Sequence, residues 1–230
     1  FDLMALVERS ASMKIADLGC GTGELTNLLH QELQAASTIG IDSSDEMLLK
    51  AQKLGSPVKF EKARIEKWKP KEKFDLIFSN AALQWCDDHE ALIAKVRKQL
   101  APGGQIAIQM PMNQDYPTHT IAREMAGEIS SEGGDEFTIQ DSVLPLGDYA
   151  SLLYRLGFQK QRAFVNVYGH VLESRTGVIE WVKGTTLTRF KDRLSPKAYA
   201  SFLKEYERRL FGEIKDEKPF FYPFKRIFLW

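Results

Sequence analysis

The sequence predicts an α/β fold built around a mostly parallel β-sheet. Strand-like and helix-like segments alternate through the first two thirds of the 230 residues, the order that repeated strand–helix–strand units produce. A glycine-rich turn, residues 19–23, joins the first strand to the first helix. The segment 74–78 is nearly all apolar, as expected for a strand that helices cover on both faces.

The first part of the chain repeats one strand–helix unit. We expect strands at residues 14–18, 38–42 and 58–60, with helices at 22–34 and 44–54 between them. These segments predict three neighbouring strands of one sheet.

The next unit begins with the apolar strand 74–78. It is followed by an amphipathic helix, His89–Leu100, whose apolar residues recur at helical spacing. The Pro-Gly-Gly segment 102–104 is expected to end that helix and turn the chain into a fifth strand, Gln105–Met110.

Regularity weakens after residue 111. The elements expected there are helices at 118–129, 144–156, 175–184 and 195–211, strands at 162–171 and 225–230, and a polar loop at 130–136. The late part of the chain therefore adds helical insertions to the α/β core.

Length and composition indicate the domain organisation and the cellular compartment. A length of 230 residues suits one domain with an insertion, or one large and one small lobe, and a content of 43% hydrophobic residues is enough to bury a core. No apolar run approaches the ~20 residues of a membrane helix, and no signal-peptide pattern is present. The two cysteines, Cys20 and Cys86, do not form a disulfide framework, which favours a reducing cytoplasm.

The net charge of zero conceals an asymmetry along the chain. Residues 1–150 hold 15 basic and 23 acidic side chains, whereas residues 151–230 hold 16 and 8. A zero balance argues against bulk attraction to nucleic acid or to a membrane. The late basic excess is consistent with solvated helix faces, or with a site for an anionic substrate.

The glycine-rich turn predicts a nucleotide-type pocket. Gly19, Gly21 and Gly23 lie between a strand and a helix, where glycine lets the backbone approach a ligand closely. The third glycine comes one residue earlier than in the dinucleotide fingerprint. Asp17 precedes the turn and would repel a pyrophosphate but suit a cationic amino group. Asp17 is alternatively a buried acid bonded to loop amides.

A second acid ends the second strand. Asp42 lies 19 residues after Gly23, and its carboxylate can accept both hydroxyls of a ribose. The alternative is that Asp42 caps the helix that begins near Asp45. Cys20, inside the turn, is interpreted as a small filler rather than a nucleophile, because no histidine stands near it in the sequence.

These motifs resemble a known family. The turn 17–23, Asp42 and the run 79–85 are similar to class I S-adenosylmethionine-dependent methyltransferases. The later segments that resemble the trans-aconitate methyltransferase family are 109–111, 117–119, 123–124, 168–170, 179–185 and 224–228. The resemblance spans almost the whole chain.

The resemblance implies a Rossmann-like sheet, mostly parallel with an antiparallel last strand, and helical cap insertions. Residues 1–111 would form the core that binds S-adenosylmethionine. Residues 112–142 and 172–222 would form the cap, and residues 143–171 and 223–230 would complete the core sheet.

The resemblance also implies the cofactor site. Asp17 and the glycine turn would lie at the methionine end, Asp42 at the ribose, and Met47 on the adenine. Met47 and Trp85 are alternatively ordinary core residues. Arg64 stands where the family usually has an acid, and arginine cannot accept a hydrogen bond from the adenine amino group. The full implied set is Asp17, Gly19, Cys20, Gly21, Gly23, Asp42, Ser43, Met47, Ala63, Arg64, Ile65, Asn80, Ala81 and Trp85.

The implied reaction is methyl transfer to a carboxylate oxygen, which gives a monomethyl ester. A carboxylate with a pKa near ~4 is already ionised at pH 7, so no strong base is required. We assign no residue as a catalytic base or nucleophile and expect no metal. Trp85 and Asn80 are expected to orient the reactants. The expected substrate-binding residues are His119, Arg123, Tyr168, His170 and Arg226. Each histidine is alternatively structural, Arg123 is alternatively a solvent-exposed ion-pair partner, and Arg226 is the preferred candidate.

Several alternatives stay open at the level of sequence. The expected substrate is trans-aconitate or a related polycarboxylate. Malonyl attached to an acyl carrier protein is a rival within the same chemistry, and a non-catalytic S-adenosylmethionine-binding module is a rival of another class. The glycine spacing and Asp17 count against an NAD-dependent dehydrogenase. We expect a monomer that binds neither nucleic acid nor membrane.

Overall fold

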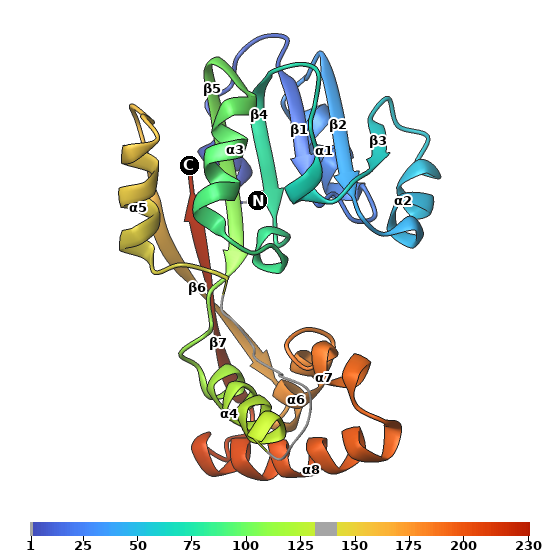
Figure 1. Cartoon of the computed structure of the whole chain (residues 1–230), viewed down its shortest axis with the longest axis vertical. Helices are drawn as coiled ribbons and strands as arrows, with labels where there is room; N and C mark the ends of the chain where they lie inside the picture. The colour runs from blue at the N-terminus through green and yellow to red at the C-terminus, as the bar shows by residue number, and fades with distance from the viewer. Residues whose placement is uncertain (1, 132–141) are drawn as a thin grey trace. The chain divides into compact units, whose positions relative to one another are not determined.

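The computed structural model describes residues 2–131 and 142–230, and it contains one seven-stranded sheet (Figure 1). Most of the expected loop 130–136 lies outside these residues. The strands are β1 (Lys14–Leu18), β2 (Ser37–Asp42), β3 (Lys59–Lys62), β4 (Phe74–Asn80), β5 (Leu100–Pro111), β6 (Ala163–Leu172) and β7 (Phe220–Leu229).

Eight α-helices and three short 3-10 helices are described. The α-helices are α1 (Glu24–Glu32), α2 (Asp45–Gln52), α3 (His89–Gln99), α4 (Pro117–Ser131), α5 (Leu146–Arg155), α6 (Thr176–Lys183), α7 (Thr188–Arg193) and α8 (Pro196–Glu213). The 3-10 helices are η1 (Met4–Leu6), η2 (Ile65–Lys67) and η3 (Leu83–Trp85).

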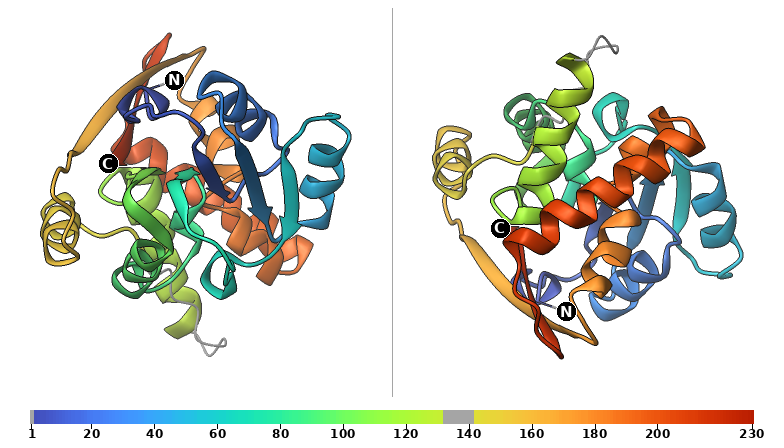
Figure 2. Two further views of the ribbon diagram at one scale, coloured as in Figure 1. Left: turned by 90° about the horizontal axis from the view of Figure 1, so that it is seen from above. Right: turned by 90° about the horizontal axis from the view of Figure 1, so that it is seen from below.

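The sheet has the strand order β3-β2-β1-β4-β5-β7-β6. β1 to β5 pair in parallel, and β7 pairs antiparallel with β5, so the predicted fold class is confirmed. The order reverses between β1 and β4, and loops diverge at such a switch point to leave a crevice at the carboxyl ends of the strands. Consistent with right-handed crossovers on either side of this point, α1 and α3 cover opposite faces of the sheet (Figure 2).

The chain divides into two compact units. The first unit holds residues 1–111, 142–166 and 226–230, and the second holds residues 112–141 and 167–225. The first unit is centred on the parallel strands, whose side chains Ile15, Leu76, Ile77 and Ile108 are fully buried. Assignment of cofactor and substrate roles to separate segments stays a prediction.

The second unit is mainly helical. Its core combines aliphatic residues of α4 and α6 with aromatic residues of α7 and α8; Phe190 and Phe202 stack with ring centroids 4.1 Å apart. The Tyr206 hydroxyl donates a 2.7 Å hydrogen bond to the Thr118 carbonyl, and Arg209 makes a two-pronged ion pair with Glu128. Aromatic burial and these bonds hold α8 against α4.

Some elements differ from the prediction. β5 begins at Leu100, before the expected turn, because the first stretch pairs with Phe74 across a register shift. β7 begins at Phe220 although Pro223 lies within it. α7 was not predicted, since six residues are too few for a clear helical period.

No helix in the described ranges has both the length and the apolar character needed to cross a membrane.

Candidate functional site

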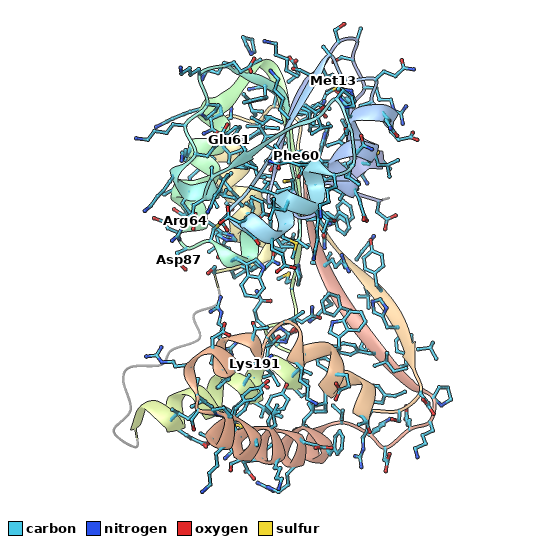
Figure 3. All side chains as sticks on the ribbon, turned by 90° about the vertical axis from the view of Figure 1, so that its right-hand side faces the viewer. Met13, Phe60, Glu61, Arg64, Asp87 and Lys191 are labelled. Atoms are coloured by element: carbon cyan, nitrogen blue, oxygen red, sulfur yellow. The ribbon has the colours of Figure 1, made fainter. Side chains whose placement is uncertain are left out.

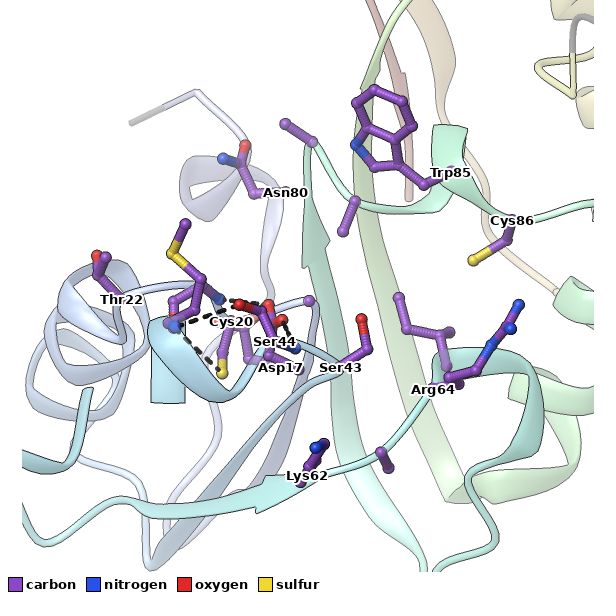
Figure 4. A pocket seen from close by; sticks show the side chains of 18 of the residues that line it. Asp17, Cys20, Thr22, Ser43, Ser44, Lys62, Arg64, Asn80, Trp85 and Cys86 are labelled. Atoms are coloured by element: carbon purple, nitrogen blue, oxygen red, sulfur yellow. Dashed lines mark hydrogen bonds between the residues drawn. The ribbon is translucent and has the colours of Figure 1, made fainter. Parts of the chain in front are cut away.

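The first unit contains a cavity of about 1020 Å³ formed by the loops that follow β1 to β4 (Figure 4). Arg64 and Asp87 mark this end of the unit, opposite Met13, which precedes β1 (Figure 3). The cavity therefore lies at the carboxyl ends of the strands, where the switch point predicts a ligand site. The lining residues are Asp17, Gly19, Cys20, Gly21, Thr22, Glu24, Leu25, Asp42, Ser43, Ser44, Met47, Lys62, Ala63, Arg64, Ile65, Glu66, Asn80, Ala81, Ala82, Trp85 and Cys86.

The glycine turn is fastened to the end of β2. The amides of Gly19 and Cys20 both donate to the Ile41 carbonyl, at 2.8 and 2.9 Å. Gly19 has a φ of +79°, and a Cβ there would lie 2.2 Å from the Ala82 Cβ. Only glycine fits this position, because a side chain would both strain the backbone and collide with the loop after β4.

Gly23 does not line the cavity. It is the N-cap of α1 with a φ of +77°, and a Cβ there would lie 2.6 Å from the Phe60 ring and 2.8 Å from the Ala51 Cβ. The structure therefore gives this glycine a packing role, at the closest approach of α1 to its neighbours, rather than the expected place on the cavity wall.

Asp42 connects two loops of the cavity. Its Oδ2 accepts a 2.9 Å hydrogen bond from the Gly21 amide, and its Oδ1 accepts a 2.8 Å bond from the Ser44 amide. The N-cap of α2 is Ser44, whose hydroxyl accepts from the Met47 amide. Asp42 is thus not the helix cap, and each oxygen of its half-buried carboxylate retains capacity for a further donor.

Asp17 is buried beneath the turn, with 2% of its surface exposed. The Thr26 hydroxyl donates a 2.6 Å bond to its Oδ2. The pKa of Asp17 is raised to about 7, mainly by burial and also by the nearby Asp42 carboxylate, against the opposing hydrogen bond from Thr26. A cation placed beside Asp17 would favour its ionised form, so the buried acid is suited to a positively charged ligand group.

Arg64 is held at the wall of the cavity by an acid two residues along. Its Nη2 donates a 3.2 Å bond to the Glu66 Oε1, and Figure 4 shows the guanidinium on the Cys86 side, across from Asp17. Burial opposes ionisation of Glu66, but hydrogen bonds from Arg64 and from the Cys86 thiol bring its pKa below the usual value. The Arg64 charge is therefore directed toward Glu66.

The loop after β4 presents Trp85 to solvent. The Trp85 side chain is 53% exposed, which excludes ordinary core packing, whereas Met47 is half-buried. Ala81 adopts a φ of +54°, uncommon for a non-glycine residue, and its amide donates to the Gln109 carbonyl at 2.8 Å. His89 Nε2 donates to the Leu83 carbonyl at 2.9 Å, which anchors the turn carrying Trp85.

The cavity suits S-adenosylmethionine in size and charge. Its volume is of the order of small-ligand sites. The lining holds four acids, Asp17, Glu24, Asp42 and Glu66, and two basic residues, Lys62 and Arg64. This excess of acids suits a ligand that carries an ammonium and a sulfonium, and it disfavours a pyrophosphate.

Residues 9–142 match the family model described as a methyltransferase domain. A Variovorax paradoxus protein named trans-aconitate 2-methyltransferase is 39% identical over 212 residues, which cover 91% of this chain and 82% of the relative. A Deinococcus radiodurans protein of the same name is 38% identical over 98% of this chain and 89% of its own length. The chain belongs to the trans-aconitate methyltransferase family.

The solved structures agree with the fold. A putative methyltransferase from Bacillus halodurans superimposes with a TM-score of 0.64 at 13% identity, covering 99% of this chain and 95% of that one. A Haemonchus contortus phosphoethanolamine N-methyltransferase bound to S-adenosylhomocysteine gives 0.56 at 16% identity, covering 99% of this chain and 50% of its own. The chain is a methyltransferase that uses S-adenosylmethionine.

Thirteen of the fourteen expected cofactor residues line the cavity, Gly23 being the exception. Leu25 and Lys62 were missed, although Leu25 lies in the first turn of α1 and Lys62 ends β3, and both places border the carboxyl edge of the sheet where the site was expected. Glu66 and Cys86 lie on or beside 3-10 turns, where no periodicity marks the inward face. The remaining lining residues absent from the expected set are Thr22, Glu24, Ser44 and Ala82.

The two cysteines behave as small apolar residues in this methyltransferase. Both line the cavity and both are buried. Burial raises the pKa of the Cys20 thiol far above its usual value and that of Cys86 to about 12. A protonated thiol is a poor nucleophile, which supports the interpretation of Cys20 as a filler.

The expected substrate residues fall in both units. Arg226 belongs to the first unit, whereas His119 and Arg123 on α4, and Tyr168 and His170 on β6, belong to the second. Arg123 donates to the Gln114 carbonyl at 3.1 Å, and His170 packs on the Trp181 ring with centroids 4.6 Å apart. Their grouping around one substrate stays a prediction.

His119 is not a cation in this structure. Burial and, to a smaller extent, the charge of the neighbouring Arg123 lower the pKa of His119 to about 4, against the opposing charge of Asp115. Its two ring nitrogens lie 2.9 Å from the Thr118 hydroxyl and 3.1 Å from the Thr186 hydroxyl. A role for His119 in substrate binding would therefore be that of a neutral hydrogen-bonding group.

Proposed function

We propose that this methyltransferase esterifies a carboxylate of a small polycarboxylate, with trans-aconitate as the first candidate. The support is the extent of the similarity. The methyltransferase-domain match ends at residue 142, but relatives named trans-aconitate 2-methyltransferase align with 98% of the chain at 38% identity. The likeness thus includes residues outside the common cofactor-binding domain, where enzymes of this fold differ in substrate.

The proposed roles follow the chemistry of the cavity. Asp17 would lie beside the ammonium group of the cofactor, and Asp42 would accept its ribose hydroxyls while keeping its bonds to the two loop amides. Met47 would pack on the adenine, bounded by the segment 63–65. Asn80 and Trp85 would orient the reactants at the end of β4.

The chain's part in the reaction would be alignment and exclusion of water. Bound S-adenosylmethionine supplies an electrophilic methyl group, and an ionised carboxylate is already a nucleophile at pH 7. The two thiols of the cavity are protonated and the Nε2 of His89 is bonded to a carbonyl, so none of these three groups is placed to act as a base, and Asp17 is assigned to the ammonium group of the cofactor. Positioning is then the main source of rate.

Calorimetry with S-adenosylhomocysteine, followed by methyl-transfer assays, tests this function. The substrate panel should hold trans-aconitate, other di- and tricarboxylates, and malonyl on an acyl carrier protein. We expect cofactor binding and preferential esterification of trans-aconitate. Preference for the carrier-bound malonyl group would replace the proposed substrate, and cofactor binding without turnover of any acid would favour a binding module.

A further inference from the structure

Three polar side chains form a row across the carboxyl edge of the sheet in the first unit. Asn80 ends β4 and is the register partner of Gln109 on β5; Arg226 on β7 is the register partner of Pro111. Register partners, and residues two apart on one strand, place their side chains on the same face of a sheet. Asn80, Gln109 and Arg226 therefore share one face, on three adjacent strands.

The Gln109 amide is oriented by its neighbour. Arg226 Nη1 donates to Gln109 Oε1 at 3.5 Å. Because a guanidinium can only donate, the amide oxygen must face Arg226, and the amide nitrogen is directed away from it.

That amide nitrogen lacks a protein partner. Gln109 is 1% exposed, and within the part of the chain that the structure describes its Nε2 makes no hydrogen bond. Buried donors in native proteins are nearly always paired, so an unpaired one calls for a group from outside the chain.

We propose that the Gln109 amide, together with Arg226, binds a carboxylate of the substrate that is not methylated. This inference rests on the proposed function. Asn80 borders the cofactor cavity and lies opposite Gln109 on the adjacent strand, at a strand spacing of about 4.8 Å. Arg226 is the diagonal neighbour of Gln109 on the next strand, so the row leads from the cavity wall to Arg226. A guanidinium and an amide N–H both donate, which matches an anion, and a polycarboxylate places a second carboxylate a few bonds from the reacting one.

The test compares Gln109→Leu with wild type on two acids. Trans-aconitate carries further carboxylates, whereas crotonate carries one carboxylate on a similar skeleton. Loss of a hydrogen bond to a charged group should raise KM for trans-aconitate about 10-fold or more and leave kcat nearly unchanged. The affinity for S-adenosylhomocysteine and the rate with crotonate should stay within about twofold of wild type.

Gln99→Leu is the matched control, because Gln99 also holds a buried amide atom without a described partner but lies at the end of α3. It should leave both substrates unaffected. The proposal is overturned if the ratio of kcat/KM for trans-aconitate to kcat/KM for crotonate is the same in Gln109→Leu as in wild type. That outcome includes a variant with a damaged fold, in which kcat/KM for both acids falls by the same factor. If wild type neither binds nor esterifies any acid, the proposed function is wrong, and this inference, which rests on it, is wrong as well.

Discussion

The cavity of the first unit and the helical core of the second unit are built on opposite principles. Around the cavity, Gly19 and Ala81 adopt positive φ values, and Asp17 is buried with a raised pKa. In the second unit, Phe190 and Phe202 stack in an apolar core that costs no desolvated charge. Residues around the cavity are strained or carry a buried ionisable group, as is common at ligand-binding sites, whereas the residues of the helical core stabilise the fold.

The largest effect on stability is expected in the helical core. Phe190 is fully buried against Phe202, so Phe190→Ala should cost about 3–5 kcal/mol of unfolding free energy by leaving a cavity. Denaturant unfolding measures the loss. Calorimetry at low temperature should show unchanged affinity for S-adenosylhomocysteine, and a large loss of affinity would contradict the division of roles between the two units.

Asp17→Asn should stabilise the folded protein at pH 8, whereas most substitutions of buried residues lower the free energy of unfolding. Since the folded pKa of about 7 lies above the ordinary aspartate pKa of 3.8, the folded form binds more protons across that interval, and wild type loses stability as pH rises from about 4 to 7. At pH 8 the asparagine variant should be more stable by about 2–4 kcal/mol, and this difference should vanish near pH 4.

Melting curves of the two proteins from pH 4 to 8 measure this difference. Parallel curves would show that burial does not raise the pKa of Asp17. Affinity of Asp17→Asn for S-adenosylhomocysteine should nevertheless fall at pH 8, because the ammonium group loses its anionic neighbour.

Gly19→Ala should weaken cofactor binding about 100-fold. The new Cβ would lie 2.2 Å from the Ala82 Cβ, which displaces the loop after β4 from the cavity wall. Gly21→Ala is the matched control: Gly21 also has a positive φ, +54°, but a Cβ there meets nothing within 4 Å, so backbone strain alone should reduce affinity by about tenfold. Equal losses in calorimetry would mean that strain, not the collision, decides the effect.

The smallest effect is expected at the surface of the second unit. Glu128 pairs with Arg209 near the surface, where an ion pair contributes no more than about 1 kcal/mol and the aromatic core does most to hold α8 against α4. Glu128→Gln should shift the melting temperature by no more than about 3 °C, less still at high salt. A larger shift would show that ion pairs share in the stability assigned to the aromatic core.

Local patterns predicted much of the site. Strand–turn–helix order and glycine spacing indicated where the chain turns, so Gly19 and Asp42 were expected on the wall that they form, and the family resemblance added Ala81. The same pattern did not indicate that Gly23 packs against Phe60, because spacing does not distinguish a glycine facing a ligand from one packed against a side chain. Glu66 escaped prediction because a 3-10 turn carries no periodic signal.

Periodicity and turn chemistry within short segments were enough to predict the fold class, the order of most elements and the kind of pocket. The paired strands were needed to show that Asp42 joins two loops, that Asp17 is buried enough to raise its pKa, and that Gln109 faces Arg226. Each of these depends on residues far apart in the chain, whose burial and hydrogen bonding arise only when the strands are paired.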